Sequence, residues 1–175
     1  MNENIQIRAS EPADLQAIEN LYGLAFPDED LLPLVRDLLD DRPDVVSLVA
    51  VTNGELVAHI AFTICSLKNM PHEAALLAPL AVAPSLHGRG LGTKMAQAGL
   101  QKMKASQMAF VLVLGDPNYY GRFGFTQEKH VLPPYELPEE WASAWQSVRL
   151  KEADLESGQK LLVPEPWRKK ALWAP

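Results

Sequence analysis

The architecture of this chain follows from the segment Leu80-Ala81-Val82-Ala83-Pro84-Ser85-Leu86-His87-Gly88-Arg89-Gly90-Leu91-Gly92-Thr93, which joins a strand to a helix. The strand is the apolar run Ala74–Val82. The helix continues to about Ser106, with apolar residues on one side and lysines and glutamines on the other. Met108–Leu114 is then an unbroken apolar run, typical of a strand covered on both faces. Strand, glycine loop, helix and buried strand together predict a βαβ unit.

Pro79 stands in the middle of the strand before the loop. Proline has no N–H to donate to a ladder, so strand pairing must break or bulge there unless the strand is an edge. A broken ladder leaves backbone donors and acceptors that can pair with an extended, amide-bearing ligand. The sequence therefore predicts a sheet that is split at the Pro79 strand, next to the glycine loop.

The residues before this unit predict further strands and helices. Asn53-Gly54 joins two β-branched runs, and this pair is the strongest short hairpin signal because both residues tolerate positive φ. Ser10 is a candidate N-cap for the first helix. The predicted elements are a strand over Ile5–Arg8, helices to about Phe26 and over Glu29–Asp40, and strands over Val45–Thr52 and Glu55–Ser66. We expect a mixed α/β (α+β) fold whose central, mostly antiparallel sheet has helices on both sides.

The residues after the buried strand are less regular. Asp116-Pro117 predicts an N-cap and the start of a short helix, Pro117–Phe123, that ends at Gly124. Beyond Phe125 prolines become frequent and all four tryptophans occur; only a short helix over Glu139–Trp145 is predicted there. We expect one domain over residues 1–175, with 126–175 as its Pro/Trp-rich extension.

Composition limits the classes of function. The 175 residues are 47% hydrophobic and 22% charged with a net charge of −6, which disfavours nonspecific binding to nucleic acid or anionic membranes. No apolar run approaches the roughly 20 residues of a membrane span, and the N-terminus lacks signal-peptide features, so a cytoplasmic protein is expected. Cys65 is the only cysteine, and His59, His72, His87 and His130 lack close ligand spacing, so no metal is expected.

The glycine loop is placed to bind an anion. At a helix N-terminus the first backbone N–H groups have no helical acceptor and the helix dipole favours negative charge, while glycines allow close approach of a phosphate. Gly88-Arg89-Gly90-Leu91-Gly92 fits neither the P-loop nor the dinucleotide fingerprint, and a plain tight turn is the alternative. Coenzyme A joins a pyrophosphate to amide-bearing pantetheine, which suits both the loop and the split sheet.

These residues resemble a known family. Leu80–Pro84 followed by His87–Gly92 resembles the acyl-CoA signature of the GNAT superfamily of N-acetyltransferases, and Tyr120–Phe125 resembles that family's later motif. Gly115–Tyr120 resembles the bacterial YhbS-like subgroup. The order of elements agrees from residue 5 to about residue 125. One residue departs from the pattern, since the family usually has glutamine or arginine where this chain has His87.

The resemblance implies an enzyme that transfers an acetyl group from acetyl-CoA, its co-substrate, directly to the amine of a small molecule or peptide. It assigns carbonyl polarisation to backbone N–H groups around Leu80–Val82, and protonation of the departing thiolate to Tyr120. A packed aromatic side chain is the alternative for Tyr120. The donor-binding residues that it implies are Leu80, Ala81, Val82, His87, Gly88, Arg89, Gly90, Leu91, Gly92, Thr93 and Asn118.

The base that deprotonates the amine is left open. His59, His72 and Glu73 are candidates, each with a merely hydrogen-bonded or solvated residue as the alternative, and water can also carry the proton. Cys65 is expected to be a small core residue and not a nucleophile. Asp116 is expected to be a helix cap.

Two further readings stay open. The chain can bind CoA as a regulatory or interaction module without catalysis, or it can acylate a protein N-terminus or lysine. The tail is predicted to close the acceptor side of the site. The alternatives for its aromatic rings are core packing and an interface between two copies in a homodimer. The rings in question are those of Trp141, Trp145, Trp167 and Trp173.

Overall fold

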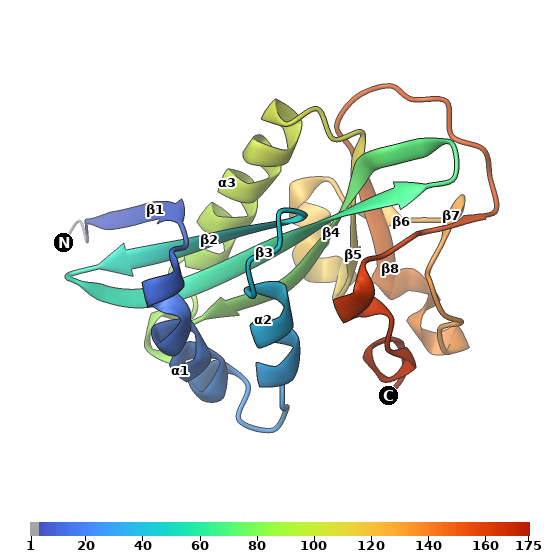
Figure 1. Cartoon of the computed structure of the whole chain (residues 1–175). Helices are drawn as coiled ribbons and strands as arrows, with labels where there is room; N and C mark the ends of the chain where they lie inside the picture. The colour runs from blue at the N-terminus through green and yellow to red at the C-terminus, as the bar shows by residue number, and fades with distance from the viewer. Residues whose placement is uncertain (1–3) are drawn as a thin grey trace. The chain divides into compact units, whose positions relative to one another are not determined.

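The computed structural model of the chain describes residues 4–175. Seven strands form a mostly antiparallel sheet in the order β1-β2-β3-β4-β5-β8-β6, and β7 pairs with β9 in a second, small sheet (Figure 1). The strands are β1 Ile5–Ala9, β2 Val45–Thr52, β3 Glu55–Leu67, β4 Met70–Val82, β5 Phe110–Leu114, β6 Thr126–Gln127, β7 Val131–Leu132, β8 Trp145–Arg149 and β9 Gln159–Lys160. The helices are α1 Leu15–Ala25, α2 Leu32–Leu38, α3 Leu91–Ala105 and α4 Pro117–Tyr120.

The chain divides into two compact units. The first unit comprises Met1–Phe62 and Ala78–Gly99, and the second unit comprises Thr63–Leu77 and Leu100–Pro175. Strands β3 and β4 and helix α3 each contribute residues to both units. The mixed α/β fold with a mostly antiparallel sheet is the one expected from the sequence.

Helices cover both faces of the strands in the first unit (Figure 1). Helices α1 and α2 bury Ile18, Tyr22 and Val35 against Val49 of β2. On the other face, α3 comes so close to β3 that a Cβ at Gly99 would lie 2.1 Å from a ring atom of Phe62. Only glycine fits at position 99. The contact between Gly99 and the Phe62 ring therefore fixes where α3 lies against β3.

Helix α1 begins differently from the prediction. Glu11, and not Ser10, makes the capping box for the 3-10 turn Pro12–Asp14 that leads into α1. The Ser10 hydroxyl instead donates to Ser47 Oγ at 2.7 Å. The prediction of Ser10 as the cap is wrong because the hydroxyl has a partner on β2, which the local sequence does not reveal.

The parallel ladder between β4 and β5 is short, as Pro79 predicts. Its register joins Ala74–Leu76 to Phe110–Leu112 and ends there, although β4 itself continues through Pro79 to Val82. The sheet is therefore split at this strand. The glycine loop begins where β4 ends.

The tail supplies a strand and part of the core of the second unit. Strand β8 pairs antiparallel with β5, with Phe110 opposite Arg149 and Leu114 opposite Trp145. Trp145, Trp167 and Trp173 are buried and meet edge to face, with ring centroids about 6 Å apart. Their indole N–H groups donate to Val131 O, Thr63 Oγ1 and Trp167 O. These three rings are core, so the prediction that they line a substrate site is wrong.

Candidate functional site

The glycine loop lies in the first unit between β4 and α3. A 3-10 turn, Pro84–Leu86, leads into it, and Gly88 and Gly90 adopt left-handed conformations with φ of 78° and 76°. A Cβ added at either glycine would meet no described atom within 4 Å. Glycine is therefore needed here for the backbone conformation, while the space beside the loop is open to a ligand.

The loop presents its N–H groups at the start of a long helix. The first helical hydrogen bond of α3 runs from Lys94 N to Gly90 O, at 3.1 Å. The preceding N–H groups, of Leu91, Gly92 and Thr93, come before the first intrahelical acceptor. They point out of the helix N-terminus, where the dipole favours an anion such as a pyrophosphate.

His87 closes the loop back onto the strand. Its Nε2–H donates to Val82 O at 2.9 Å, and Ala83 N donates to Val57 O at 2.8 Å. The imidazole thus holds the loop to the end of β4. This contact gives a physical role to the residue at which the sequence departs from the family pattern.

The tyrosine pair lies in the second unit, after β5. Asp116 caps α4, since its carboxylate accepts from Asn118 N at 2.9 Å, as predicted. The Tyr120 ring packs edge to face against Tyr119, Phe123 and Phe125. Burial raises the pKa of Tyr120 well above its ordinary value, with a smaller contribution from Tyr119. Because burial disfavours the phenolate, the hydroxyl keeps its proton near neutral pH and can donate it to a ligand.

His59 is part of a buried chain of hydrogen bonds in the first unit. The imidazole is 1% exposed and contacts the Tyr22 hydroxyl through Nδ1 at 2.7 Å and Ser47 Oγ through Nε2 at 2.8 Å. Burial lowers the pKa of His59 to about 3. Such an imidazole is too weak a base to take a proton from an amine near neutral pH, so His59 ties α1 to β2 and is not the general base.

The depressed pKa predicts that the folded chain loses stability as pH falls below about 6.5, the ordinary histidine value. Between that value and about 3, only the unfolded state binds the proton at His59. The free energy of unfolding should fall by about 2 kcal/mol between pH 7.5 and pH 5. Urea unfolding at both pH values measures this loss. His59→Gln should lose much less over the same interval, and equal losses in both proteins would contradict the prediction.

The remaining candidates for a nucleophile or a base, Cys65, His72 and Glu73, make hydrogen bonds or ion pairs within the protein. Cys65 is 2% exposed and its thiol donates to Thr63 O at 3.3 Å, as expected of a core residue. Glu73 pairs with Lys151 at 3.4 Å, and the exposed His72 donates its backbone N–H to Ser66 Oγ at 2.8 Å. Within residues 4–175, no group of three or more His, Cys, Asp or Glu side chains is arranged to hold a metal.

A cavity of about 320 Å³ opens in the first unit where α1 turns into α2. It is lined by Tyr22, Gly23 and residues 26–32, which include the consecutive acids Asp28, Glu29 and Asp30. Phe26, Leu31 and Leu32 from its wall pack on the same hydrophobic cluster as Ala81 and Ala83. The cavity thus shares a core with the last residues of β4, just before the glycine loop. This cavity was not predicted from the sequence, because the expected second helix began at Glu29, whereas α2 begins at Leu32 and leaves the three acids between the helices.

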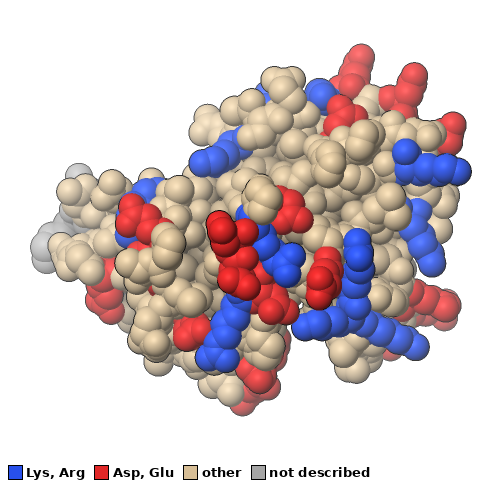
Figure 2. Space-filling model, in the orientation of Figure 1, with Lys and Arg blue, Asp and Glu red and all other residues tan. Residues whose placement is uncertain are grey.

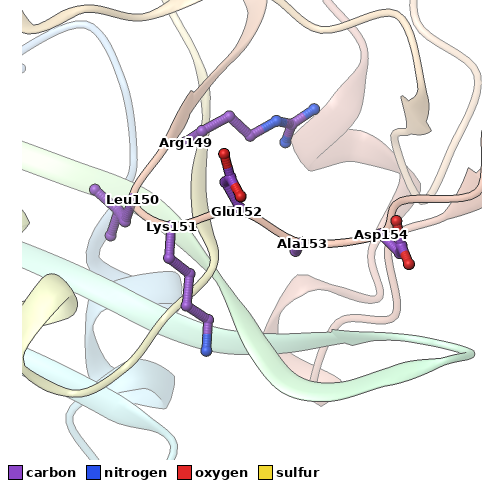
Figure 3. Close-up of a pocket in the computed structure, with 6 residues that line it drawn as sticks. All are labelled: Arg149, Leu150, Lys151, Glu152, Ala153 and Asp154. Atoms are coloured by element: carbon purple, nitrogen blue, oxygen red, sulfur yellow. The ribbon is translucent and has the colours of Figure 1, made fainter.

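A larger cavity, of about 770 Å³, lies in the second unit along residues 149–154 (Figure 3). Its cationic side chains already have carboxylate partners, because Arg149 pairs with Glu128 at 2.8 Å and Lys151 pairs with Glu73. Glu152 and Asp154 add negative charge to the same wall. We assign no ligand to it.

The distribution of surface charge favours binding of an anion at one specific site over binding to a broad basic surface. On the face drawn in Figure 2, lysine and arginine side chains alternate with aspartate and glutamate, and no broad basic area is visible there. No helix within residues 4–175 combines the length and apolar character needed to cross a membrane. Since the net charge of the chain is −6 as well, we expect an anionic ligand to be held by a specific feature such as the glycine loop.

Comparison with known proteins identifies the family. A model of the acetyltransferase (GNAT) family matches residues 15–125, from α1 to the end of the motif that contains Tyr120. This chain belongs to the GNAT family of acetyltransferases. The glycine loop, the split β4 strand and the tyrosine motif all lie within the matched residues.

Relatives of this acetyltransferase are known in Escherichia coli. The uncharacterized N-acetyltransferase YjhQ of strain K12 is 34% identical over 78% of this chain and 79% of its own length. The uncharacterized N-acetyltransferase YhbS of the same strain is 32% identical over 71% of this chain and 75% of its own length. The crystal structure of Escherichia coli YhbS in complex with CoA has a TM-score of 0.85 to this structure, with 26% identity, and covers 97% of this chain and 94% of that one. A GNAT acetyltransferase from Brucella melitensis, crystallised with acetyl-CoA, shares the fold with a TM-score of 0.75 at 22% identity, over 94% of this chain and 99% of that one.

The structure assigns the predicted site residues of the acetyltransferase to two places. Leu80, Ala81, Val82 and the loop His87–Thr93 form one continuous segment of the first unit. Asn118 and Tyr120 lie in α4 of the second unit. Asn118 uses its backbone N–H for the Asp116 cap.

Proposed function

We propose that this protein transfers an acetyl group from acetyl-CoA to an amine by direct attack. The observation that carries the proposal is the loop at the start of α3, where left-handed Gly88 and Gly90 precede three N–H groups that lack helical acceptors. The crystal structures of two relatives with CoA and acetyl-CoA support this ligand. In this proposal the pyrophosphate binds at the loop. A cytoplasmic location and a homodimer remain predictions from the sequence.

The reaction needs a polarised carbonyl and a proton for the leaving group. The amine nitrogen attacks the thioester carbon, the carbon–sulfur bond breaks, and the electron pair leaves on sulfur. Backbone N–H groups around Leu80–Val82 would polarise the carbonyl oxygen. Tyr120 would donate its proton to the thiolate and regain one from solvent before the next turnover. Because the pKa of His59 is too low for a base, water is the acceptor we propose for the proton of the amine.

The cavity between α1 and α2 is the place that we propose for the acceptor. Its apolar wall shares a core with Ala81 and Ala83, beside the segment proposed to hold the thioester. Asp28, Glu29 and Asp30 give it a negative lining, which favours acceptors that carry a second positive charge in addition to the reacting amine.

Release of thiol from acetyl-CoA tests the function. A screen of diamines, simple monoamines, amino acids and peptides should show amine-dependent thiol release, with diamines ahead of neutral monoamines. Binding of CoA without thiol release from any amine would favour the alternative, a noncatalytic CoA-binding module. Preference for long peptides would instead favour acylation of protein lysines or N-termini.

Gly90→Val should weaken CoA binding at least about tenfold, because a hydrogen bond to a charged group contributes roughly 1.5–3 kcal/mol. The branched side chain cannot adopt φ of 76° without strain, and it stands where the phosphate would approach. Calorimetry with CoA measures the change. Gly158→Val is the matched control, since Gly158 has φ of 89° and open surroundings in the second unit. A folded Gly90→Val protein with unchanged affinity would contradict the loop assignment.

A further inference from the structure

Gln146 is a buried polar side chain that the proposed mechanism does not use. It lies in β8 and is 1% exposed. In the antiparallel register it stands opposite Val113, next to the last pair of the ladder, Leu114 and Trp145. A primary amide buried this deeply costs free energy unless its hydrogen bonds are made. Its partners therefore indicate what the residue does.

The amide of Gln146 holds Gly115, the residue that follows the last pair of the ladder. Its Nε2 donates to Gly115 O at 3.0 Å and, at a longer 3.4 Å, to Ala144 O. Gly115 N in turn donates to Ala144 O at 3.0 Å. Both polar backbone groups of Gly115 are thus held by residues 144–146. The side chain of Gln146 supplies a bond that the strand pairing itself does not provide.

Gly115 is also the surface on which Tyr120 rests. A Cβ at Gly115 would lie 2.5 Å from Cε2 and 3.0 Å from Cδ2 of the Tyr120 ring. The ring therefore lies directly on the Gly115 backbone. On its other sides it meets Tyr119 and Phe125, at centroid distances of 5.0 and 5.7 Å. Because the ring packs on this backbone, a shift of the Gly115 peptide would change the position of the Tyr120 ring.

We propose that Gln146 is a positioning residue for Tyr120. Its hydrogen bond to Gly115 O fixes the peptide against which the phenol packs, and so fixes the hydroxyl from which the proton is donated. The proposal rests on the proposed function, because it assumes that Tyr120 is the acid. An error of about 1 Å in the place of a reacting group can cost on the order of 100-fold in rate. A partial displacement of the ring should therefore be visible in kcat.

A double-mutant cycle with Tyr120→Phe tests the proposal. The amine that releases most thiol in the screen serves as acceptor, with acetyl-CoA as donor. Gln146→Met keeps the length of the side chain and removes the donor. It should lower kcat about tenfold in the protein that retains Tyr120, change the acetyl-CoA KM less than twofold, and have no further effect in the Tyr120→Phe protein.

Ser147→Ala is the control on the neighbouring residue of β8. Ser147 Oγ donates to Glu128 and not to Gly115, so its loss should lower the melting temperature without the Tyr120-dependent fall in kcat. If Gln146→Met does not fold, Gln146→Leu, which also lacks any hydrogen-bond donor, goes through the same cycle with the same expectation.

Each outcome separates the inference from the proposed function. The same loss of kcat in both backgrounds would show that Gln146 supports only the fold and would overturn the inference, while thiol release by the native protein would still support the function. An unchanged kcat in the Gln146 variants would also overturn it. Absence of effect in Tyr120→Phe itself would remove the proposed acid, and with it any positioning role.

Discussion

Tyr120→Phe is expected to lower kcat on the order of 100-fold, near the low end of general-acid catalysis, and to leave the acetyl-CoA KM nearly unchanged. The substitution removes only the hydroxyl, so the ring can keep its edge-to-face contacts with Tyr119, Phe123 and Phe125. The raised pKa of Tyr120 adds a second expectation. Since the acid form is the active one and burial disfavours the phenolate, activity should show no alkaline limb from Tyr120 below pH 10.

Tyr119→Phe provides the matched control for this result. Tyr119 is the adjacent phenol, and the Arg122 guanidinium lies over its ring at 4.7 Å. Its variant should keep kcat within about twofold, because the hydroxyl that we assign to proton transfer is unaffected. Initial rates of thiol release, under conditions where chemistry limits turnover, measure both variants. Equal kcat values for native protein and Tyr120→Phe would reduce Tyr120 to a packing residue.

Trp173→Ala should reduce the free energy of unfolding by about 3–5 kcal/mol, the range for truncating a large aromatic core residue. The indole is 2% exposed and contacts the rings of Trp145 and Trp167. Removing it also leaves Trp167 O without the indole donor that lies 3.0 Å away. Urea unfolding measures the loss, with intrinsic fluorescence interpreted separately for each variant because the substitution removes a fluorophore.

Trp141→Ala controls for the loss of any tail tryptophan. Trp141 is only partly buried, so the same truncation should cost less than half as much. CoA affinity of the folded Trp173→Ala protein should be unchanged, because the indole contacts Trp145 and Trp167, which have no part in the proposed donor site. A loss below 1 kcal/mol would show that the tail does not stabilise the core of the second unit.

Local patterns predicted the parts of the fold whose cause is local. The Asn53-Gly54 turn has φ of 51° and 77° at its two residues, as the hairpin requires. The capped helix after Asp116 and the start of α3 at Leu91 also appear where the sequence indicates them. In each case a glycine, asparagine or aspartate acts within a few residues of its own position.

Features that depend on distant partners escaped the same reasoning. Strand β8 has the sequence WQSVR, with no clear alternation, and it is a strand because β5 pairs with it. His59 was visible as a polar residue on an apolar strand, but its partner Tyr22 lies 37 positions away along the chain. The amide of Gln146 and the peptide of Gly115 are 31 positions apart. The periodicity of a short sequence segment cannot predict hydrogen bonds between residues this far apart in the chain.

The division of β3, β4 and α3 between the two units has a consequence for synthesis on the ribosome. All residues of the first unit have been translated once Gly99 is added. The segment Thr63–Leu77, in contrast, must wait for Phe110–Leu114 and then for β8 before its own unit can form. At a translation rate of ~5–20 residues per second, the interval between the addition of Leu77 and the addition of Arg149 is roughly 4–14 s. Until β5 and then β8 have been translated, β4 is paired only with β3. Its second edge is then open in the nascent chain, and we expect chaperones to bind this apolar segment during translation.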